Sequence, residues 1–216
     1  MTLGIAAIVL MITAQYFIYV YAPLEETMGA VQKIFYSHLP LAWWALASFF
    51  VVFASSIVYL LRRESKWDLL AGGAAELGVL MSGLALVTGS VWARAAWNTW
   101  WTWDPRLSTT LIMWFVYSGY LVQRMTGSNR EQRAMISAVI GIVAFIDVPL
   151  VFYSARLWRS IHPAVFASQG GGLEPEMWVA VFVSLAAWGM LWVLLLRIRV
   201  RQLRAGERID TAMTEM

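Results

Sequence analysis

Six long apolar stretches limit what this chain can fold into. Each is long enough to cross a hydrocarbon layer of about 30 Å as a helix, which rises about 1.5 Å per residue. They lie near residues 3–21, 40–61, 69–91, 107–123, 134–154 and 177–198. Because lipid offers no hydrogen-bond partner to an exposed backbone, each stretch must cross as a helix. The sequence therefore predicts an all-α fold, a polytopic membrane bundle of six transmembrane helices.

The composition favours a membrane protein without a separate soluble domain. Of the 216 residues, 60% are hydrophobic and 13% are charged, whereas soluble domains are about 45–50% apolar and about 25% charged. We therefore expect a single membrane domain over residues 1–216, with the first stretch kept as an uncleaved span. Cysteine is absent, which excludes disulfides, thiolate metal sites and thioether-linked groups within this chain.

The distribution of Lys and Arg predicts the orientation. The loops after the second and fourth stretches and the C-terminal tail hold eleven of them: Arg62, Arg63, Lys66, Arg124, Arg130, Arg133, Arg197, Arg199, Arg201, Arg204 and Arg208. The opposite side holds five, spread over longer segments: Lys33, Arg94, Arg106, Arg156 and Arg159. Since cytoplasmic loops are enriched in Lys and Arg, both termini are expected in the cytoplasm. Residues 22–39, 92–106 and 155–176 would then face outward.

The outward segment 92–106 is unusually rich in tryptophan. It carries five of the thirteen tryptophans: Trp92, Trp97, Trp100, Trp101 and Trp103. An aromatic belt at the membrane interface is one interpretation. A platform for a flat, apolar ligand is the other, and we favour it because a belt needs only one or two indoles per helix end. Indole faces stack on a π-system at little conformational cost.

Charged residues in the same segment add to the ligand hypothesis. Arg94 and Arg106 have planar, permanently charged side chains that match carboxylates on the rim of a ligand. Asp104 precedes Pro105, a pattern typical of the first residues of a helix. The sequence leaves Asp104 two roles, an N-cap of the fourth span or a direct contact to the ligand.

The chain has only two histidines, and both flank this surface. His38 lies just before Pro40, where we expect the second span to begin, and His162 lies in the third outward segment. A lone histidine is more often structural than a ligand, but imidazole is a common axial ligand of heme iron. Heme is flat, apolar and rimmed by two carboxylates. Two imidazoles, several indoles and two arginines therefore predict a heme site, held without a covalent bond.

Two acidic residues fall at membrane depth. Ionisable groups there are costly and are candidates for function. For Glu76 we favour a polar link between helices over a functional role. Asp147, two residues before Pro149, has two open interpretations: a similar polar link, or a partner that fixes a histidine tautomer.

The segment WARAAWNTWWTWDPRLSTTLIMWFVYSGYL, residues 92–121, resembles the WWD signature of heme-handling membrane proteins of cytochrome c biogenesis. The resemblance extends to TGS at residues 88–90, YSHLPLAW at 36–43 and DVPLVFYSARLWRSIHP at 147–163. Length and span number resemble the CcmC type within the superfamily that also contains CcmF and CcsA. Two departures are Asp147, where members carry Asn, and Pro105, where some carry Ala.

The resemblance implies a protein that handles and delivers heme and is not an enzyme. Heme b would bind transiently on the periplasmic face of the cytoplasmic membrane, with His38 and His162 as axial ligands. The platform would comprise Trp97, Trp100, Trp101, Trp103, Asp104 and Arg106. The implied partners are a CcmE-type periplasmic heme chaperone, CcmA-type and CcmB-type ABC transporter subunits and a small CcmD-type protein, with no nucleic acid. The alternatives are a membrane b-type cytochrome that transfers electrons and a heme channel within an ABC exporter.

Overall fold

The computed structural model describes residues 2–126, 129–157 and 173–214, and helices dominate them. The elements are α1 (Thr2–Tyr16), the π-helical turn η1 (Phe17–Tyr21), the 3₁₀ helix η2 (Ala30–Ile34), α2 (Phe35–Arg62), α3 (Ser65–Trp97), α4 (Pro105–Arg124), α5 (Arg130–Ala144), α6 (Asp147–Leu157) and α7 (Pro175–Thr214). Within these described ranges there is no β-strand, only an isolated bridge between Glu25 and Gly29. The predicted all-α fold is confirmed.

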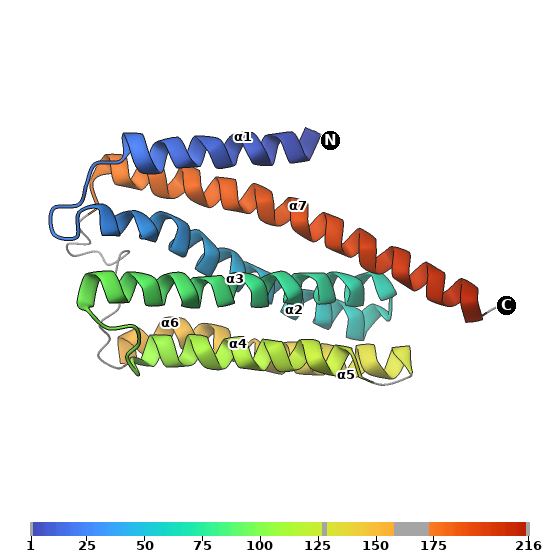
Figure 1. Ribbon diagram of the computed structural model, residues 1–216. Helices are drawn as coiled ribbons and strands as arrows, with labels where there is room; N and C mark the ends of the chain where they lie inside the picture. Colours follow the sequence, from blue (N-terminus) through green and yellow to red (C-terminus); the bar gives the residue numbers. More distant parts are fainter. Residues whose placement is uncertain (1, 127–128, 158–172, 215–216) are drawn as a thin grey trace.

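The helices run up and down, so that both described ends of the chain lie at the same end of the bundle (Figure 1). Five helical segments in the described part of the chain are long and apolar enough to cross a membrane: Thr2–Tyr21, Ala30–Arg62, Ser65–Trp97, Arg130–Ser154 and Pro175–Met213. Helix α4, of 20 residues, contains the remaining predicted stretch, the fourth, at residues 107–123. The protein is a multi-pass helical membrane bundle.

Helices α2 and α3 pack against each other along the centre of the bundle. Helix α7 contacts both and carries α1 on its outer side, while α4, α5 and α6 pack together on the opposite side (Figure 1). We call the end that holds η1, η2 and the 98–104 loop the outer end, and the end that holds the C-terminus the inner end. The outer end collects all three segments that the sequence predicts to face outward, as far as they are described.

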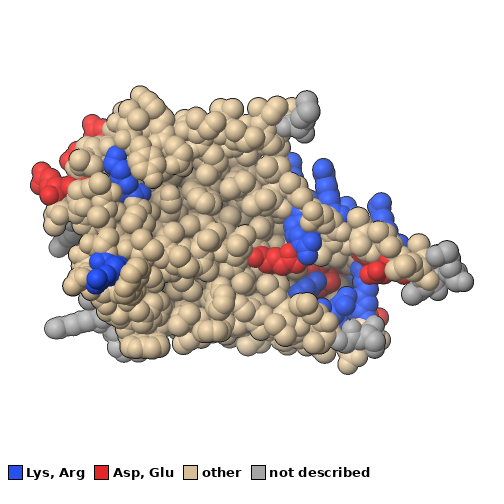
Figure 2. All heavy atoms as spheres, viewed as in Figure 1, with Lys and Arg blue, Asp and Glu red and all other residues tan. Residues whose placement is uncertain are grey.

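The two ends differ in charge. Lys and Arg side chains gather mainly at the inner end, while much of the surface between the ends is uncharged (Figure 2). This distribution is the pattern on which the positive-inside prediction rests. An uncharged middle flanked by polar ends suits a protein that crosses a membrane.

Small residues let the central helices approach closely. A Cβ added at Gly78 on α3 would lie 2.5 Å from a ring carbon of Phe49 on α2. Phe49 in turn stacks on Tyr117 of α4, with ring centroids 3.7 Å apart. On the other side of α2, Trp44 packs where Gly189 of α7 has no side chain. Small residues at such contacts are typical of helix packing in membranes.

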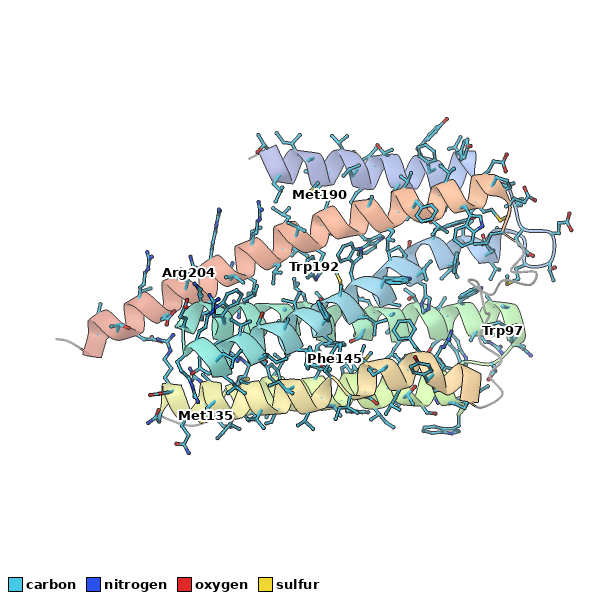
Figure 3. The ribbon with its side chains drawn as sticks, turned by 180° about the vertical axis from the view of Figure 1, so that it is seen from behind. Trp97, Met135, Phe145, Met190, Trp192 and Arg204 are labelled. Atoms are coloured by element: carbon cyan, nitrogen blue, oxygen red, sulfur yellow. The ribbon has the colours of Figure 1, made fainter. Side chains whose placement is uncertain are left out.

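Two indoles, one of them buried, hold α7 against α2. The Nε1–H of Trp44 donates to the Leu185 carbonyl over 3.0 Å. Trp192, labelled in Figure 3, donates its Nε1–H to the Ser48 hydroxyl over 2.7 Å and stacks on Trp44. Hydrogen bonds of this kind satisfy polar groups that lipid cannot solvate. They also fix the rotation of α7 about its own axis.

The fifth predicted span is broken in two. Helix α5 ends at Ala144 and α6 begins at Asp147. Pro149 has no N–H to donate to the carbonyl of Phe145, four residues earlier, and its ring crowds that carbonyl, which favours a break in the helix at this point. The Phe145 carbonyl accepts instead from the Val148 N–H over 3.1 Å, as in a tighter turn. Phe145 lies at this break, between α5 and α6 (Figure 3).

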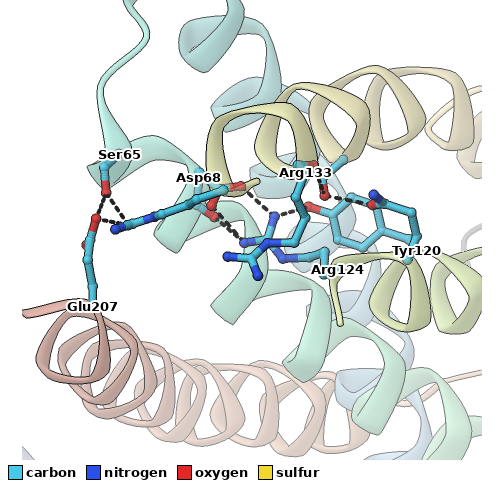
Figure 4. Close-up of polar contacts among 9 residues, drawn as sticks. Ser65, Asp68, Tyr120, Arg124, Arg133 and Glu207 are labelled. Carbon is cyan, nitrogen blue, oxygen red and sulfur yellow. Dashed lines mark hydrogen bonds and ion pairs between the residues drawn. The ribbon is translucent and has the colours of Figure 1, made fainter. Parts of the chain in front are cut away.

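Ion pairs tie the helices together toward the inner end. The Nη1 and Nη2 groups of Arg124 on α4 donate hydrogen bonds to the Asp68 carboxylate of α3, over 2.6 Å and 3.0 Å (Figure 4). Nearby, Arg130 of α5 pairs with Glu207 of α7, and the Ser65 hydroxyl donates to the same carboxylate. One stretch of α3 therefore makes polar contacts with α4, α5 and α7.

Glu76, one of the acidic residues at membrane depth, also has a partner. Its carboxylate accepts from Arg199 of α7, through Nη2 over 2.9 Å and through Nε. The ion pair joins α3 to α7. This supports the interpretation of Glu76 as a polar link between helices.

Candidate functional site

His38 lies inside α2, in its first turn. The second span was expected to begin near Pro40, whereas its helix begins five residues earlier, at Phe35, and η2 leads directly into it. Phe35 and Tyr36 are both buried, so packing favours helix ahead of the proline. Pro40 removes only one hydrogen bond here, the one to the Tyr36 carbonyl. His38 therefore projects from regular helical backbone.

The imidazole of His38 lies against α3. Its Nδ1 is 3.0 Å from the Thr88 hydroxyl oxygen. A Cβ added at Gly89 would lie 3.1 Å from His38 Cε1, so the absent side chain leaves room for the ring. On the next turn of α3, the ring of Trp92 lies 6.0 Å from the imidazole, centroid to centroid. Three residues of α3 thus surround one histidine of α2.

Trp92 is the inward-facing member of the tryptophan segment. Its side chain is buried, with ring centroids 5.8 Å from Phe35 and 6.0 Å from Trp97. Its indole nitrogen is buried and has no hydrogen-bond partner among the described residues. A buried donor left without an acceptor costs about 1–3 kcal/mol. Trp92 therefore offers a donor beside His38.

The other tryptophans of the segment face outward to different degrees. Trp97 is 41% exposed, Trp100 60% and Trp103 79%, whereas Trp101 is half-buried and meets Trp103 edge to face. Trp97 lies at the outer end of α3 (Figure 3). The five indoles thus range from one buried beside His38 to one almost fully exposed. Exposed indoles that lie close together are typical of a binding surface.

Arg94 and Asn98 shape the turn that follows α3. Asn98 ends the helix with a φ of +57°, a left-handed conformation that Asn tolerates better than most residues. Arg94 donates to the Asn98 carbonyl over 2.9 Å and lies over the Trp100 ring, 5.9 Å from its centroid. Arg94 is exposed, so its guanidinium remains within reach of an anion at the outer end.

Asp104 caps α4. Its carboxylate accepts from the Arg106 N–H over 2.9 Å and its carbonyl accepts from the Ser108 N–H, with Pro105 as the first helical residue. The N-cap interpretation of Asp104 is therefore confirmed, and its carboxylate is buried. The Arg106 side chain, half-buried, follows directly at the start of α4.

Asp147 lies at the start of α6, away from the residues that surround His38. Its Oδ2 is buried and has no hydrogen-bond partner in the described ranges. The hydrogen-bond partner of His38 Nδ1 is Thr88 and not this aspartate. His162, the second predicted ligand, lies outside the described residues.

Three contributors to this site, Thr88, Gly89 and Asn98, were not among the predicted site residues. Thr88 and Gly89 belong to the TGS segment, which carried the resemblance but had no role assigned to it. Asn98 carried a usable signal, since Asn often ends a helix in the left-handed conformation. No comparable local signal marks Thr88, because it meets His38 fifty positions away in the sequence.

Comparison with known proteins gives a consistent family. Residues 1–215 match the family described as CcmC, heme exporter protein C. The heme exporter protein C of Rhodobacter capsulatus is 32% identical over 184 residues, which cover 84% of this chain and 76% of that protein. A putative cytochrome c biosynthesis ccmC-like mitochondrial protein of Marchantia polymorpha is 28% identical over 183 residues, covering 84% and 78%. The heme exporter protein C of Escherichia coli K12 is 25% identical over 201 residues, covering 93% and 82%.

The match extends over nearly the whole chain, and its relatives come from several bacteria and a plant mitochondrion. It therefore includes all six spans, the tryptophan segment and both histidines. The chain belongs to the heme exporter protein C (CcmC) family.

Proposed function

We propose that this protein binds heme at the outer end of the bundle and delivers it for cytochrome c maturation. The observation that carries the proposal is the placement of His38 beside Trp92 and the exposed indoles, at one end of a membrane bundle. The relatives are named for heme export and cytochrome c biosynthesis, which gives the flat, apolar ligand its identity. By the positive-inside rule this end faces the periplasm, across the cytoplasmic membrane.

The described residues fit heme as a cargo. The buried Trp92 indole N–H needs an acceptor, and a heme propionate would supply one. Arg94 and Arg106 are suited to the same carboxylates. The exposed indoles of Trp97, Trp100 and Trp103, with Trp101 behind them, would cover the macrocycle. His38 and His162 would be the axial ligands of the iron, with Asp104 holding the loop through its cap of α4.

The binding is reversible and the protein is a carrier. Without cysteine the chain cannot form thioether bonds to heme b. We infer that it passes heme to a CcmE-type periplasmic chaperone, together with CcmA-type and CcmB-type ABC transporter subunits and a CcmD-type small protein. Its relatives are named as heme exporters. An exporter transfers a cargo and does not need to carry out chemistry on a substrate.

An absorption spectrum of the detergent-purified protein tests the proposal. We expect a Soret band with low-spin visible bands after heme is added, and about a tenfold or greater loss of bound heme in His38→Ala and in His162→Ala. Circular dichroism of both variants checks that the helices are retained. Parent protein that binds no heme, or variants that bind it as the parent does, would contradict this assignment.

Transfer separates a carrier from an electron-transfer cytochrome. Heme-loaded protein mixed with a purified CcmE-type chaperone should lose its Soret absorbance to the chaperone, and the two proteins can be separated by affinity tag. A resident cytochrome would keep its heme under the same conditions. A heme channel would instead require passage of heme across sealed vesicles.

A further inference from the structure

The Thr88 hydroxyl, which lies within hydrogen-bond distance of His38, also has an acceptor on its own helix. The Thr88 side chain donates to the Leu84 carbonyl of its own helix over 2.8 Å, with the Ala85 carbonyl 3.2 Å away. A hydroxyl has a single proton and two lone pairs. With that proton on the Leu84 carbonyl, the Thr88 oxygen would accept from His38 Nδ1, 3.0 Å away.

This arrangement selects one form of the imidazole. If Thr88 accepts, then His38 Nδ1 must be the nitrogen that carries the proton, and the ring lone pair lies on Nε2. The hydrogen bond that one ring nitrogen makes decides which nitrogen serves as a metal ligand. In this arrangement α3 would set the tautomer before any ligand binds.

The surroundings of Thr88 also constrain the position of the imidazole ring. Gly89, the next residue, leaves space for Cε1, and Trp92 flanks the ring one turn later. His38 and Thr88 both lie within helices, on α2 and α3. These two helices pack against each other. The ring therefore has a set position and orientation relative to the tryptophan surface.

We infer that Thr88 is a positioning residue for heme delivery, which holds His38 as the Nδ1–H tautomer so that Nε2 is directed to the iron. This inference rests on the proposed function, since it takes heme iron as the group that His38 binds. Thr88 acts through His38, as a hydrogen-bond acceptor that also raises the basicity of the ligating nitrogen.

The tautomer can be measured without heme. Because the chain has only two histidines, ¹⁵N-histidine labelling of the heme-free protein gives two imidazoles, and His38→Ala identifies the resonances of His38. We expect the Nδ1–H tautomer in the parent and in Thr88→Ser, which keeps the hydroxyl. Thr88→Val has a similar shape without the hydroxyl, and we expect a mixture of both tautomers there.

Heme binding gives the second readout. Thr88→Val should bind heme about 10- to 100-fold more weakly, the usual loss when a hydrogen-bond partner of a metal ligand is removed, and its heme midpoint potential should shift. Thr88→Ser, which keeps the hydroxyl, should retain the heme affinity and the midpoint potential of the parent. Thr13→Val is the matched control, because Thr13 makes the same backbone hydrogen bond on α1, to the Val9 carbonyl over 2.9 Å, away from the site.

The outcomes are distinct. A parent His38 that is the Nε2–H tautomer would overturn the inference, and so would Thr88→Val with the tautomer and heme affinity of the parent. If His38→Ala binds heme normally, the proposed ligand is wrong, yet the tautomer measurement still tests the contact. A loss in Thr13→Val equal to that in Thr88→Val would assign the effect to helix stability and overturn the role of Thr88.

Discussion

At the scale of single residues, the absent side chain of Gly89 is a feature on which His38 depends. A Cβ there would approach His38 Cε1 to 3.1 Å, which is tighter than ordinary van der Waals contact. Gly89→Ala should therefore displace the imidazole and lower heme affinity by about tenfold, a loss of about 1.4 kcal/mol. Heme titration followed at the Soret band measures it.

Gly119→Ala provides the control for this prediction. A Cβ at Gly119, on α4, meets no atom within 4 Å. Both substitutions replace glycine by alanine inside a helix, which on its own stabilises the helix by up to about 1 kcal/mol. Gly119→Ala should leave heme affinity unchanged. If the two variants bind heme with equal affinity, the space at Gly89 is not required to position His38.

The residues that could be predicted are those whose signal is local. The cap by Asp104 had a local signal in the adjacent Pro105, although the sequence also allowed a ligand contact. The side of the membrane on which His38 lies rests on the charges of the loops and stays a prediction. The contact of His38 with Thr88 depends on how α2 packs against α3, so no spacing in the sequence reveals it. The burial of Trp92 likewise depends on Phe35, on another helix. The heme site therefore remains a prediction, with its α2–α3 contacts supplied by the structure.

At the scale of helices, the Asp68–Arg124 pair joins α3 to α4 through a bidentate contact (Figure 4). Both side chains are largely buried, at 10% and 15% exposed. Removal of one partner of a buried pair leaves an uncompensated charge and costs about 3–5 kcal/mol. We expect Arg124→Leu to lower the unfolding free energy by about that amount, measured by denaturant titration in detergent with tryptophan fluorescence.

Two further variants make this prediction specific. The double variant Asp68→Leu/Arg124→Leu removes both charges and should recover much of the lost stability, because neither charge is then left unpaired. Glu64→Gln breaks the exposed pair with Lys66 and should cause no measurable loss. If the double variant is as unstable as Arg124→Leu, lost packing and not the unpaired charge accounts for the effect.

Helix existence was predictable and helix ends were not. Continuous apolar runs determine six spans, because only helices satisfy the backbone in lipid. Helix α7 continues to Thr214, beyond the predicted end near residue 198, since Arg, Leu, Ala and Glu favour helix after the apolar run ends. Pro149 was a signal for the break before Asp147. Hydropathy alone does not separate α5 from α6, because both lie in one continuous apolar stretch.

At the scale of the whole molecule, the two ends are held by different interactions. Toward the inner end, charged side chains link α3 to α4 and α5 to α7. At the outer end, contacts among Phe35, Trp92 and Trp97 join α2 to α3. An aromatic end can present apolar surface to a flat ligand, and a charged end suits the cytoplasm, where Lys and Arg are retained.

The orientation of the whole bundle can be tested because the chain contains no cysteine. Glu26 lies exposed at the outer end, Ala212 lies exposed near the C-terminus, and Ile12 is 66% exposed on the apolar surface of α1. A membrane-impermeant thiol reagent applied to spheroplasts should label Glu26→Cys but not Ala212→Cys, which should react only after the membrane is opened. Ile12→Cys, in lipid, should react poorly in both conditions. Labelling of Ala212→Cys in intact spheroplasts would reverse the orientation and place the aromatic end in the cytoplasm, where delivery to a periplasmic chaperone could not occur.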